Sequence, residues 1–279
     1  MVLGGTGKTG RRVVARLVAL GVSVRVGARG ADIPFDWGDR SGWRAVLGGV
    51  EAVYLAYQPD LAMPGAPSDI KAFTAAARAA GVRRVVLLSG RGEPEARECE
   101  GIVLASRLEV TIVRSAFFAQ NFSEGVFLAS VLAGVVALPN GDVPEPFVDA
   151  DDIAEVAVRA LTEDGHVGRV YEVTGPRALS FAEAVGEIAA ATGREIAFAE
   201  LSRTEFIASL ACSALPGEVV SLLDYLFGTL FDGRNSATAD GVREALGRAP
   251  KDFAVYAREA AESGVWGGSA RPKLVGASE

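Results

Sequence analysis

Three glycines spaced three residues apart stand at the start of the chain, in the stretch VLGGTGKTG. Gly4 permits a tight turn, Gly7 lets backbone N–H groups approach a phosphate, and Gly10 lets a helix pack closely on a strand. The segment RRVVARLVALG that follows has apolar residues at helical spacing, and the free amides of its first turn would face the glycines. This order of strand, glycine turn and helix predicts a site for the pyrophosphate of a dinucleotide.

The same stretch contains GKT, which is typical of a triphosphate-binding loop. That loop needs a glycine five residues before the glycine that precedes lysine, and Val2 occupies this position. We therefore expect Thr6, Lys8 and Thr9 to lie in a dinucleotide site. Two alternatives stay open: a strand–turn–helix junction without a ligand, and a first strand whose true start lies upstream of Met1.

Composition and charge restrict the class of protein. The chain has 279 residues and a net charge of −7, which is unfavourable for a nucleic-acid surface. Its two cysteines, Cys99 and Cys212, are too far apart in sequence to suggest a disulfide framework or a metal cluster. The longest uncharged apolar run, GVFLASVLAGVVALP, is shorter than the ~20 residues of a membrane-spanning helix. We expect a cytoplasmic monomer or homodimer that binds a small molecule, without metal, nucleic-acid or membrane partners.

Strand and helix patterns alternate through the first half of the chain, and the second half is mostly helical. Strands are expected at residues 22–29, 33–37, 50–57, 83–90, 109–116, 169–175 and 196–201, and helices at 11–21, 40–49, 66–82, 98–108, 147–161, 180–193, 204–214, 217–231, 239–246 and 251–260. Repeated β–α units with nearly continuous apolar strands predict an α/β fold with a doubly wound, Rossmann-type parallel sheet. Ser180 and Glu183 have the spacing of a capping box.

These elements suggest a division of the chain. We expect residues 1–150 to form the dinucleotide-binding domain, with elements in 151–175 returning to it. Residues 176–266 would form a smaller, mostly helical substrate lobe, and residues 267–279 a flexible tail. Ligands of such sheets bind at the carboxyl ends of the strands, so the residues that follow each strand are the site candidates.

Arg29 ends the second expected strand, where dinucleotide folds carry either an acid for the ribose hydroxyls or an arginine for a 2′-phosphate. No acid stands there, so Arg29 favours NADPH over NADH, with Lys8 as a second cation. The alternative is a solvated surface arginine. For Asp36, a bond to the adenine amine and a cap of the following turn both stay open.

The usual proton donor of short-chain dehydrogenases is missing. These enzymes place a tyrosine and a lysine four residues apart, but no tyrosine lies between Tyr57 and Tyr171, and no lysine between Lys71 and Lys251. Tyr57 follows a strand and could border the nicotinamide ribose or the substrate. The identity of any proton donor therefore stays open.

Ser89 and Asn121 are the other catalytic candidates, because each follows a strand of the expected sheet. The charged residues that follow Ser89, among them Glu93, fit a solvated loop. His166, the single histidine, fits a surface loop and is not a candidate.

The substrate walls are expected to be aromatic. Phe117 and Phe118 follow the strand at 109–116, where flat apolar surfaces would suit a nicotinamide ring. The segment 217–231 is apolar at helical spacing, so Tyr225 or Phe227 would roof the pocket. The alternative is that this segment is ordinary core or a dimer face.

Six ordered motifs then carry a family resemblance: VLGGTGKTGRRV, VRVGAR, VVLLSG, IVRSAFFAQNF, PFVDADDIAEVA and VYEVTGP. Together they resemble the NmrA-like branch of the atypical short-chain dehydrogenases, from residue 1 to about Trp266. Within that branch, GGTGKT and FAQNFSE are most similar to bacterial relatives of the ergot-type iminium reductases. Ser115 stands where the family usually has proline.

The resemblance implies an NADP(H)-binding α/β domain and a C-terminal substrate lobe. The expected cofactor contacts are Gly4, Thr6, Gly7, Lys8, Thr9, Gly10, Arg29, Asp36, Ser89, Phe117 and Asn121. The expected substrate contacts are Tyr57, Phe118, Tyr225 and Phe227.

Chemistry narrows the reaction. Hydride transfer to an unactivated ketone needs a positioned acid, which the sequence lacks. An iminium carbon already carries positive charge, and the oxygens of a quinone take protons from water. We therefore expect an NADPH-dependent oxidoreductase that reduces a quinone or an imine/iminium-type aromatic substrate in secondary metabolism. The alternative is a non-catalytic NADP(H)-binding redox sensor of the NmrA type.

Overall fold

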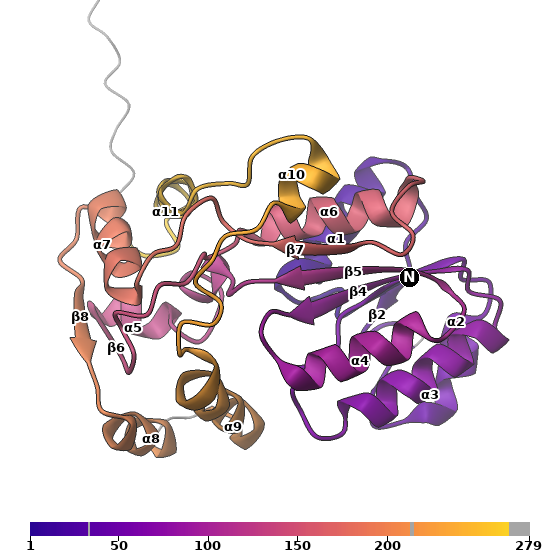
Figure 1. Ribbon diagram of the computed structural model, residues 1–279, viewed down its shortest axis with the longest axis horizontal. Coiled ribbons are helices and arrows are strands. Elements are labelled where there is room, and N and C mark those ends of the chain that lie inside the picture. Colours follow the sequence, from indigo (N-terminus) through magenta and orange to yellow (C-terminus); the bar gives the residue numbers. More distant parts are fainter. Residues whose placement is uncertain (33, 213–214, 268–279) are drawn as a thin grey trace, which may run out of the picture.

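A parallel sheet of six strands forms the centre of the molecule, in the order β2-β1-β3-β4-β5-β7 (Figure 1). The computed structural model describes residues 1–32, 34–212 and 215–267. The strands span Val2–Leu3 (β1), Val26–Gly27 (β2), Ala52–Leu55 (β3), Arg84–Gly90 (β4), Glu109–Ser115 (β5) and Val170–Val173 (β7). Every pairing between neighbouring strands is parallel. The doubly wound α/β fold expected from the sequence is confirmed.

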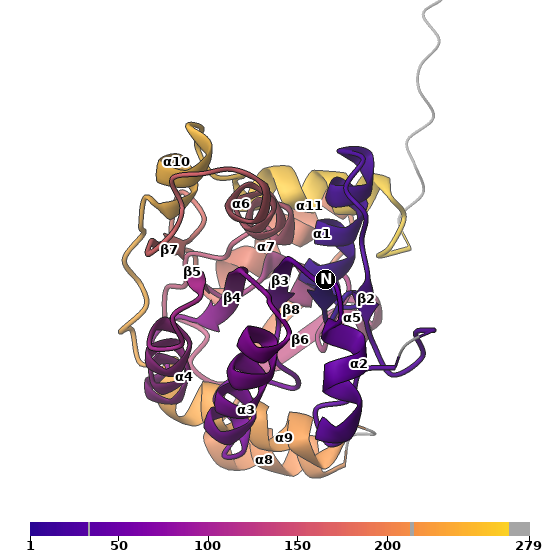
Figure 2. The same cartoon turned by 90° about the vertical axis from the view of Figure 1, so that its right-hand side faces the viewer.

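Helices cover both faces of this sheet (Figure 2). One face carries α1 (Lys8–Ala19), α6 (Ala150–Thr162) and α10 (Gly241–Leu246), and the other carries α2 (Trp43–Leu47), α3 (Ala66–Ala79) and α4 (Pro94–Leu104). Each helix buries an apolar stripe, as Ile70, Phe73 and Ala77 of α3 do at helical spacing. The strands are therefore covered on both sides, which is why they are nearly continuous in apolar residues.

The region after β1 differs from the expectation. The strand expected at 22–29 is reduced to β2, and the described residues of 33–37 form no strand. Phe35 stacks on Trp43 with ring centroids 5.8 Å apart, and Trp37 packs edge-on against Phe35 at 4.9 Å. These large rings bury themselves beneath the sheet, so aromatic packing replaces backbone pairing there.

The arrowheads of β4 and β5 point towards a second region, which lies beside the carboxyl ends of the strands (Figure 1). We call it the C-terminal region, although residues 128–138 also belong to it. Its two-stranded parallel sheet pairs β6 (Val135–Leu138) with β8 (Ala197–Glu200). Its helices are α5 (Leu128–Ala133), α7 (Phe181–Thr192), α8 (Arg203–Ala211), α9 (Gly217–Tyr225), the π-helical turn η3 (Leu226–Leu230) and α11 (Phe253–Glu262). The expected capping box of Ser180 and Glu183 is present at the start of α7.

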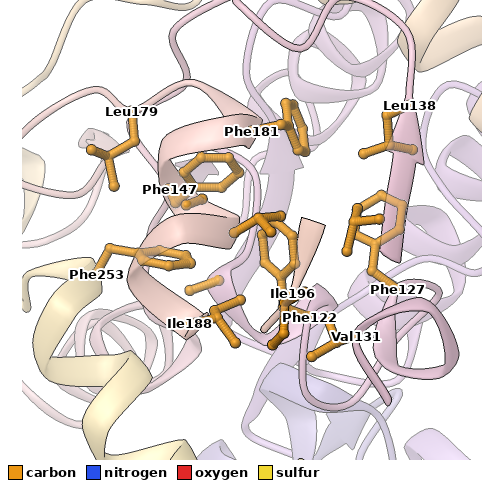
Figure 3. Close-up of a cluster of buried hydrophobic side chains, with 14 of the residues drawn as sticks. Phe122, Phe127, Val131, Leu138, Phe147, Leu179, Phe181, Ile188, Ile196 and Phe253 are labelled. Carbon is orange, nitrogen blue, oxygen red and sulfur yellow. The ribbon is translucent and has the colours of Figure 1, made fainter. Parts of the chain in front are cut away.

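Phenylalanines form the core of this region. Around the apolar side of α7, the rings pack edge to face or tilted against one another (Figure 3): Phe122, Phe127, Phe147, Phe181 and Phe253. Within the described residues, no helix is long and apolar enough to cross a membrane. The expected flexible tail, apart from its first residue, lies outside the described residues.

Gly10 fixes the position of α1 against β1. A Cβ at this position would overlap the carbonyl group of Gly4 and lie 2.8 Å from the Cα of Gly5. We predict that Gly10→Ala lowers the free energy of unfolding by ~1–3 kcal/mol, because backbone atoms must move apart. Gly101→Ala is the matched control: Gly101 lies exposed within α4 with open space around it, and alanine there should add ~0.5–1 kcal/mol. Urea denaturation measures both, and equal effects would contradict the packing role.

Candidate functional site

The glycine turn leaves the first amides of α1 open. Gly4 adopts a left-handed conformation with φ +64°, which glycine tolerates and other residues rarely adopt. Gly7 is the residue before α1 and gives its helix no side-chain cap, and the first turn holds no acidic residue. The N-terminus of α1 therefore presents N–H groups and a partial positive charge, as an anionic ligand requires.

A cavity of about 530 Å³ runs from this turn to the C-terminal region. The residues that line it follow the carboxyl ends of β1, β3, β4 and β5, as the fold class predicts. They include the turn residues Gly4, Thr6, Gly7, Lys8 and Thr9, the loop Tyr57 to Leu61, the segments Leu88 to Arg91 and Ser115 to Phe118, and Asn121. Helix α9 and turn η3 close the opposite side with Val219, Leu222, Leu223, Leu226 and Leu230.

The turn fits a pyrophosphate because side-chain atoms are missing where one would lie. A Cβ on Gly7 would point to within 3.8 Å of Nε2 of Gln58 and 3.2 Å of the carbonyl oxygen of Gly4. Gly10 is buried and does not line the cavity, so its role is the packing of α1 and not contact with a cofactor. Thr9 is also buried, and its hydroxyl accepts a hydrogen bond from Tyr54 at 2.9 Å, which directs the side chain inwards.

Arg29 is exposed and lines a second cavity, which Thr6 also lines. Lys8 lines the first cavity and not the second, so its role as a second cation for the 2′-phosphate stays a prediction. A Cβ on Gly125, beyond the end of β5, would lie 3.0 Å from the Lys8 ammonium. Burial lowers the pKa of Lys8, and the negative charge of Glu124 opposes this shift.

Asp36 caps a turn. Its Oδ1 accepts the backbone N–H of Gly38 at 2.8 Å, and its side chain is exposed and lines neither cavity. The expected contact between Asp36 and adenine is therefore not supported, and the turn-capping alternative holds.

The three catalytic candidates all line the cavity, but two have hydroxyls bound elsewhere. Tyr57 donates to Asp69 at 2.7 Å, and burial together with this carboxylate raises its pKa. Ser89 is buried and donates to Oε1 of Glu100 at 2.7 Å. Neither hydroxyl has a proton free to donate to a ligand. Asn121 keeps a half-buried side chain for which no hydrogen bond is found among the described residues.

Phe117 and Phe118 line the cavity as expected, but the roof differs. Phe227 is fully buried in the phenylalanine core, and Tyr225 donates to Glu95 at 2.7 Å outside the cavity lining. The residues of η3 that line the cavity are Leu226 and Leu230, and not Phe227. The segment 217–231 does cover the cavity, with aliphatic side chains of α9 and η3 and with Phe231.

Two glutamates are buried in the cavity wall. The sequence predicted a solvated loop for Glu93 and did not single out Glu145. Glu93 is 6% exposed and Glu145 is 2% exposed, and both line the cavity. Glu145 accepts the N–H of Phe117 at 3.1 Å, and burial raises its pKa to about 7. Burial and the neighbouring Asp60 raise the pKa of Glu93 to about 9. The only sequence signal for Glu93 is the Ser89-Gly90 pair, which ends a strand three residues upstream.

His166 and the cysteines lie outside the site. His166 is buried, contrary to the expected surface loop, and its Nδ1 lies 2.8 Å from the Tyr171 hydroxyl. Cys99 is buried with its pKa raised by burial to about 12, and Cys212 is exposed. Neither thiol lines the cavity.

Known proteins resemble the chain over nearly its whole length. An uncharacterized oxidoreductase of Bacillus subtilis, YesF, is 31% identical over 95% of this chain and 96% of its own. The (4-alkanoyl-5-oxo-2,5-dihydrofuran-3-yl)methyl phosphate reductase of Streptomyces griseus is 33% identical over 94% of this chain and 98% of its own. No protein-family model matches the chain.

The chain belongs to the NmrA-like family of atypical short-chain dehydrogenases, a family of NAD(P)H-dependent oxidoreductases. Its fold is also that of a crystal structure of an NADPH-dependent quinone oxidoreductase from Escherichia coli complexed with NADPH. The two superpose with a TM-score of 0.75 at 22% identity, over 92% of this chain and 98% of the other. The family and the oxidoreductase class expected from the six motifs are confirmed.

The raised pKa of Glu93 has a consequence for stability. The folded protein holds this proton up to about pH 9, whereas the ordinary glutamate pKa is 4.5. The stability that the proton contributes is fully present below pH 4.5 and is lost as the pH rises towards 9. We predict that the free energy of unfolding of Glu93→Gln, relative to that of the wild type, rises across this pH range by more than ~1 kcal/mol, since one pKa unit corresponds to ~1.4 kcal/mol. Urea denaturation at several pH values measures this difference in stability. For the control Glu98→Gln, at an exposed site of α4, the difference from the wild type should not change with pH.

Proposed function

We propose that the protein is an NADPH-dependent reductase that transfers a hydride to a quinone or to an imine/iminium-type aromatic substrate. One observation carries this proposal: a single cavity joins the open helix N-terminus at Gly7 to an apolar chamber between Phe117 and Leu226. The first end suits a pyrophosphate and the second a flat, uncharged ring. The relatives include proteins named NAD(P)H azoreductase, from Xenophilus azovorans, and quinone oxidoreductase 2, from Escherichia coli, which supports this class of substrate.

Residues of this chain would bind the cofactor by its two ends. Gly4, Gly7 and the first amides of α1 would hold the pyrophosphate, and Arg29 would meet the 2′-phosphate. Phe117 and Asn121 would border the nicotinamide. Bound NADPH supplies a hydride at its nicotinamide ring, and the protein contributes its position and surroundings.

The other wall of the cavity would position the acceptor. Leu222, Leu226 and Phe231 provide an apolar surface opposite Phe117, and such a surface excludes water from the reacting groups. Among the described residues of this roof none is cationic, so a planar neutral ring would be held by stacking and shape. A small-molecule partner is thus part of the proposal, as are a cytoplasmic location and a monomeric or dimeric state.

We predict that the purified protein oxidises NADPH when a quinone or an imine/iminium compound is added. Leu222→Ala and Leu226→Ala should raise the KM for that acceptor while NADPH affinity stays unchanged, because both side chains line the substrate end. Absorbance of NADPH follows turnover, and fluorescence titration follows binding. Tight NADPH binding without turnover on any acceptor would favour the redox-sensor alternative.

The cofactor preference tests Arg29. NADPH should bind more tightly than NADH by ~1.5–3 kcal/mol, the value of a hydrogen bond to a charged group. Arg29→Ala should remove this preference by weakening NADPH binding alone. Arg44→Ala, at an exposed arginine of α2, is the matched control and should leave it intact. Equal affinities in the wild type would contradict the assignment.

The phosphate site tests Gly7. Its backbone has φ −78°, so a larger residue is sterically allowed and the protein should still fold. We predict that Gly7→Val abolishes detectable binding of both NADPH and NADH, since its side chain fills the space of the pyrophosphate. Circular dichroism checks the fold, and normal cofactor affinity in a folded variant would show that the phosphate binds elsewhere.

A further inference from the structure

Two carboxyl groups face each other in the cavity wall, at the ends of neighbouring strands. Glu93 follows β4 and directly precedes α4, and Asp60 lies in the loop after β3. Both line the cavity, and each carboxyl acts electrostatically on the pKa of the other. The Glu93 carboxyl lies against Gly90, where a Cβ would overlap it. The glycine at the end of β4 therefore makes the room in which this acid is buried.

The Glu93 carboxyl is buried and incompletely bonded. The residue is 6% exposed, and its Oε2 has no hydrogen-bond partner among the described residues. Since Asp60 has only carboxyl oxygens, the two groups bond to each other only when one of them carries a proton. A buried carboxyl with an unbonded oxygen, next to a second acid in the same cavity wall, favours a proton held on the pair.

The charges around this pair also favour the protonated form. Asp60 faces Glu93 from the loop after β3, Glu95 and Glu100 from α4, and Tyr225 from α9. Cys99 of α4 faces Asp60.

Arg91, two residues before Glu93 in the chain, does not compensate for the charge of these acids. Arg91 donates to Glu172 at 3.2 Å and to the carbonyl oxygens of Asn235 and Ala237 at 2.8 and 2.6 Å. With burial and several acids on one side and no paired cation on the other, the pKa of Glu93 rises to about 9, so its carboxyl is neutral at pH 7.

We infer that Glu93 is the proton donor of the reaction, a catalytic acid that stands in for the absent tyrosine, and that Asp60 is the residue that positions its proton. This inference rests on the proposed function and extends it to the class of substrate: acceptors that need a proton as well as a hydride, such as neutral imines and quinones.

The atoms and electrons balance in this step. Hydride from NADPH adds to the acceptor, and the displaced π-electron pair collects on its nitrogen or oxygen. The O–H bond of Glu93 breaks as the new N–H or O–H bond forms. The products are NADP⁺, the reduced neutral compound and the Glu93 carboxylate, which regains a proton from water. A preformed iminium cation takes the hydride alone and needs no proton at this stage.

Infrared spectroscopy tests the proton on the cofactor-free protein. We expect a protonated-carboxyl band that persists at pH 7, disappears as the pH rises through about 9, and is missing in Glu93→Gln. Asp60→Asn should move its midpoint to lower pH, because a neighbouring negative charge is removed. Glu98→Gln, at an exposed glutamate of α4, should change neither. Glu145, with its pKa of about 7, would give a separate band that is lost at lower pH. A band with its midpoint near pH 9 that survives in Glu93→Gln would overturn the assignment.

A pair of substrates tests the donor role. One skeleton is offered with NADPH as a neutral imine and as its N-methylated iminium cation, and single-turnover rates are compared. General acids contribute ~10²–10⁴-fold, so Glu93→Gln should lower the imine-to-iminium rate ratio by at least ~10²-fold. Glu98→Gln should leave that ratio unchanged.

The outcomes separate the two proposals. Equal slowing of both substrates by Glu93→Gln would overturn the donor role and leave the reductase proposal standing. A wild type that binds NADPH but reduces neither substrate would overturn the reductase proposal and the donor role with it, even where the infrared band belongs to Glu93.

Discussion

The contact between Gly10 and the carbonyl of Gly4 is the constraint on which the site depends. It brings the first turn of α1 against the backbone that leaves β1, with no room for a Cβ between them. Because of this approach, the open amides of α1 and the left-handed Gly4 face the same cavity. A wider junction would separate the helix dipole from the turn, and neither alone would concentrate enough positive potential for a pyrophosphate.

A buried charge network holds the other strand ends in register with that turn. Arg114 of β5 donates to both carboxylate oxygens of Glu100 on α4, at 2.9 and 2.6 Å, and to Glu172 of β7 at 2.6 Å. Ser89 joins the same network through Glu100. A buried cation that is bonded bidentately is costly to leave unpaired, so these partners lock the ends of β4, β5 and β7 together. Ser89 thus serves the scaffold of the site.

The sequence predicted what local patterns encode. The glycine turn, the parallel sheet and the positions of the strand ends follow from spacing and apolar runs, and the structure brings those ends to one cavity. The roof differs from the expectation because Leu226 continues the cavity face of Val219 and Leu222 at helical spacing, whereas the next residue, Phe227, is buried in the core. Apolar periodicity alone does not show which side of a helix that is apolar on all sides faces the cavity. The burial of Glu93 was not predictable, since the charged run around it does not show that another segment covers it.

Burying acids beside an apolar roof is unfavourable for folding. Here the buried acids line the cavity in which we propose that the reaction takes place. A carboxyl with solvent access is an anion at neutral pH and has no proton to give. The same aliphatic side chains of α9 and η3 that suit a flat ring also keep water from Glu93 and Glu145. Substrate shape and proton availability are therefore set by one surface: a mutation that opens the roof would weaken substrate binding and at the same time let the acids ionise. Under the proposed function, the C-terminal region would act on the reaction through the dielectric of the cavity as well as through contact.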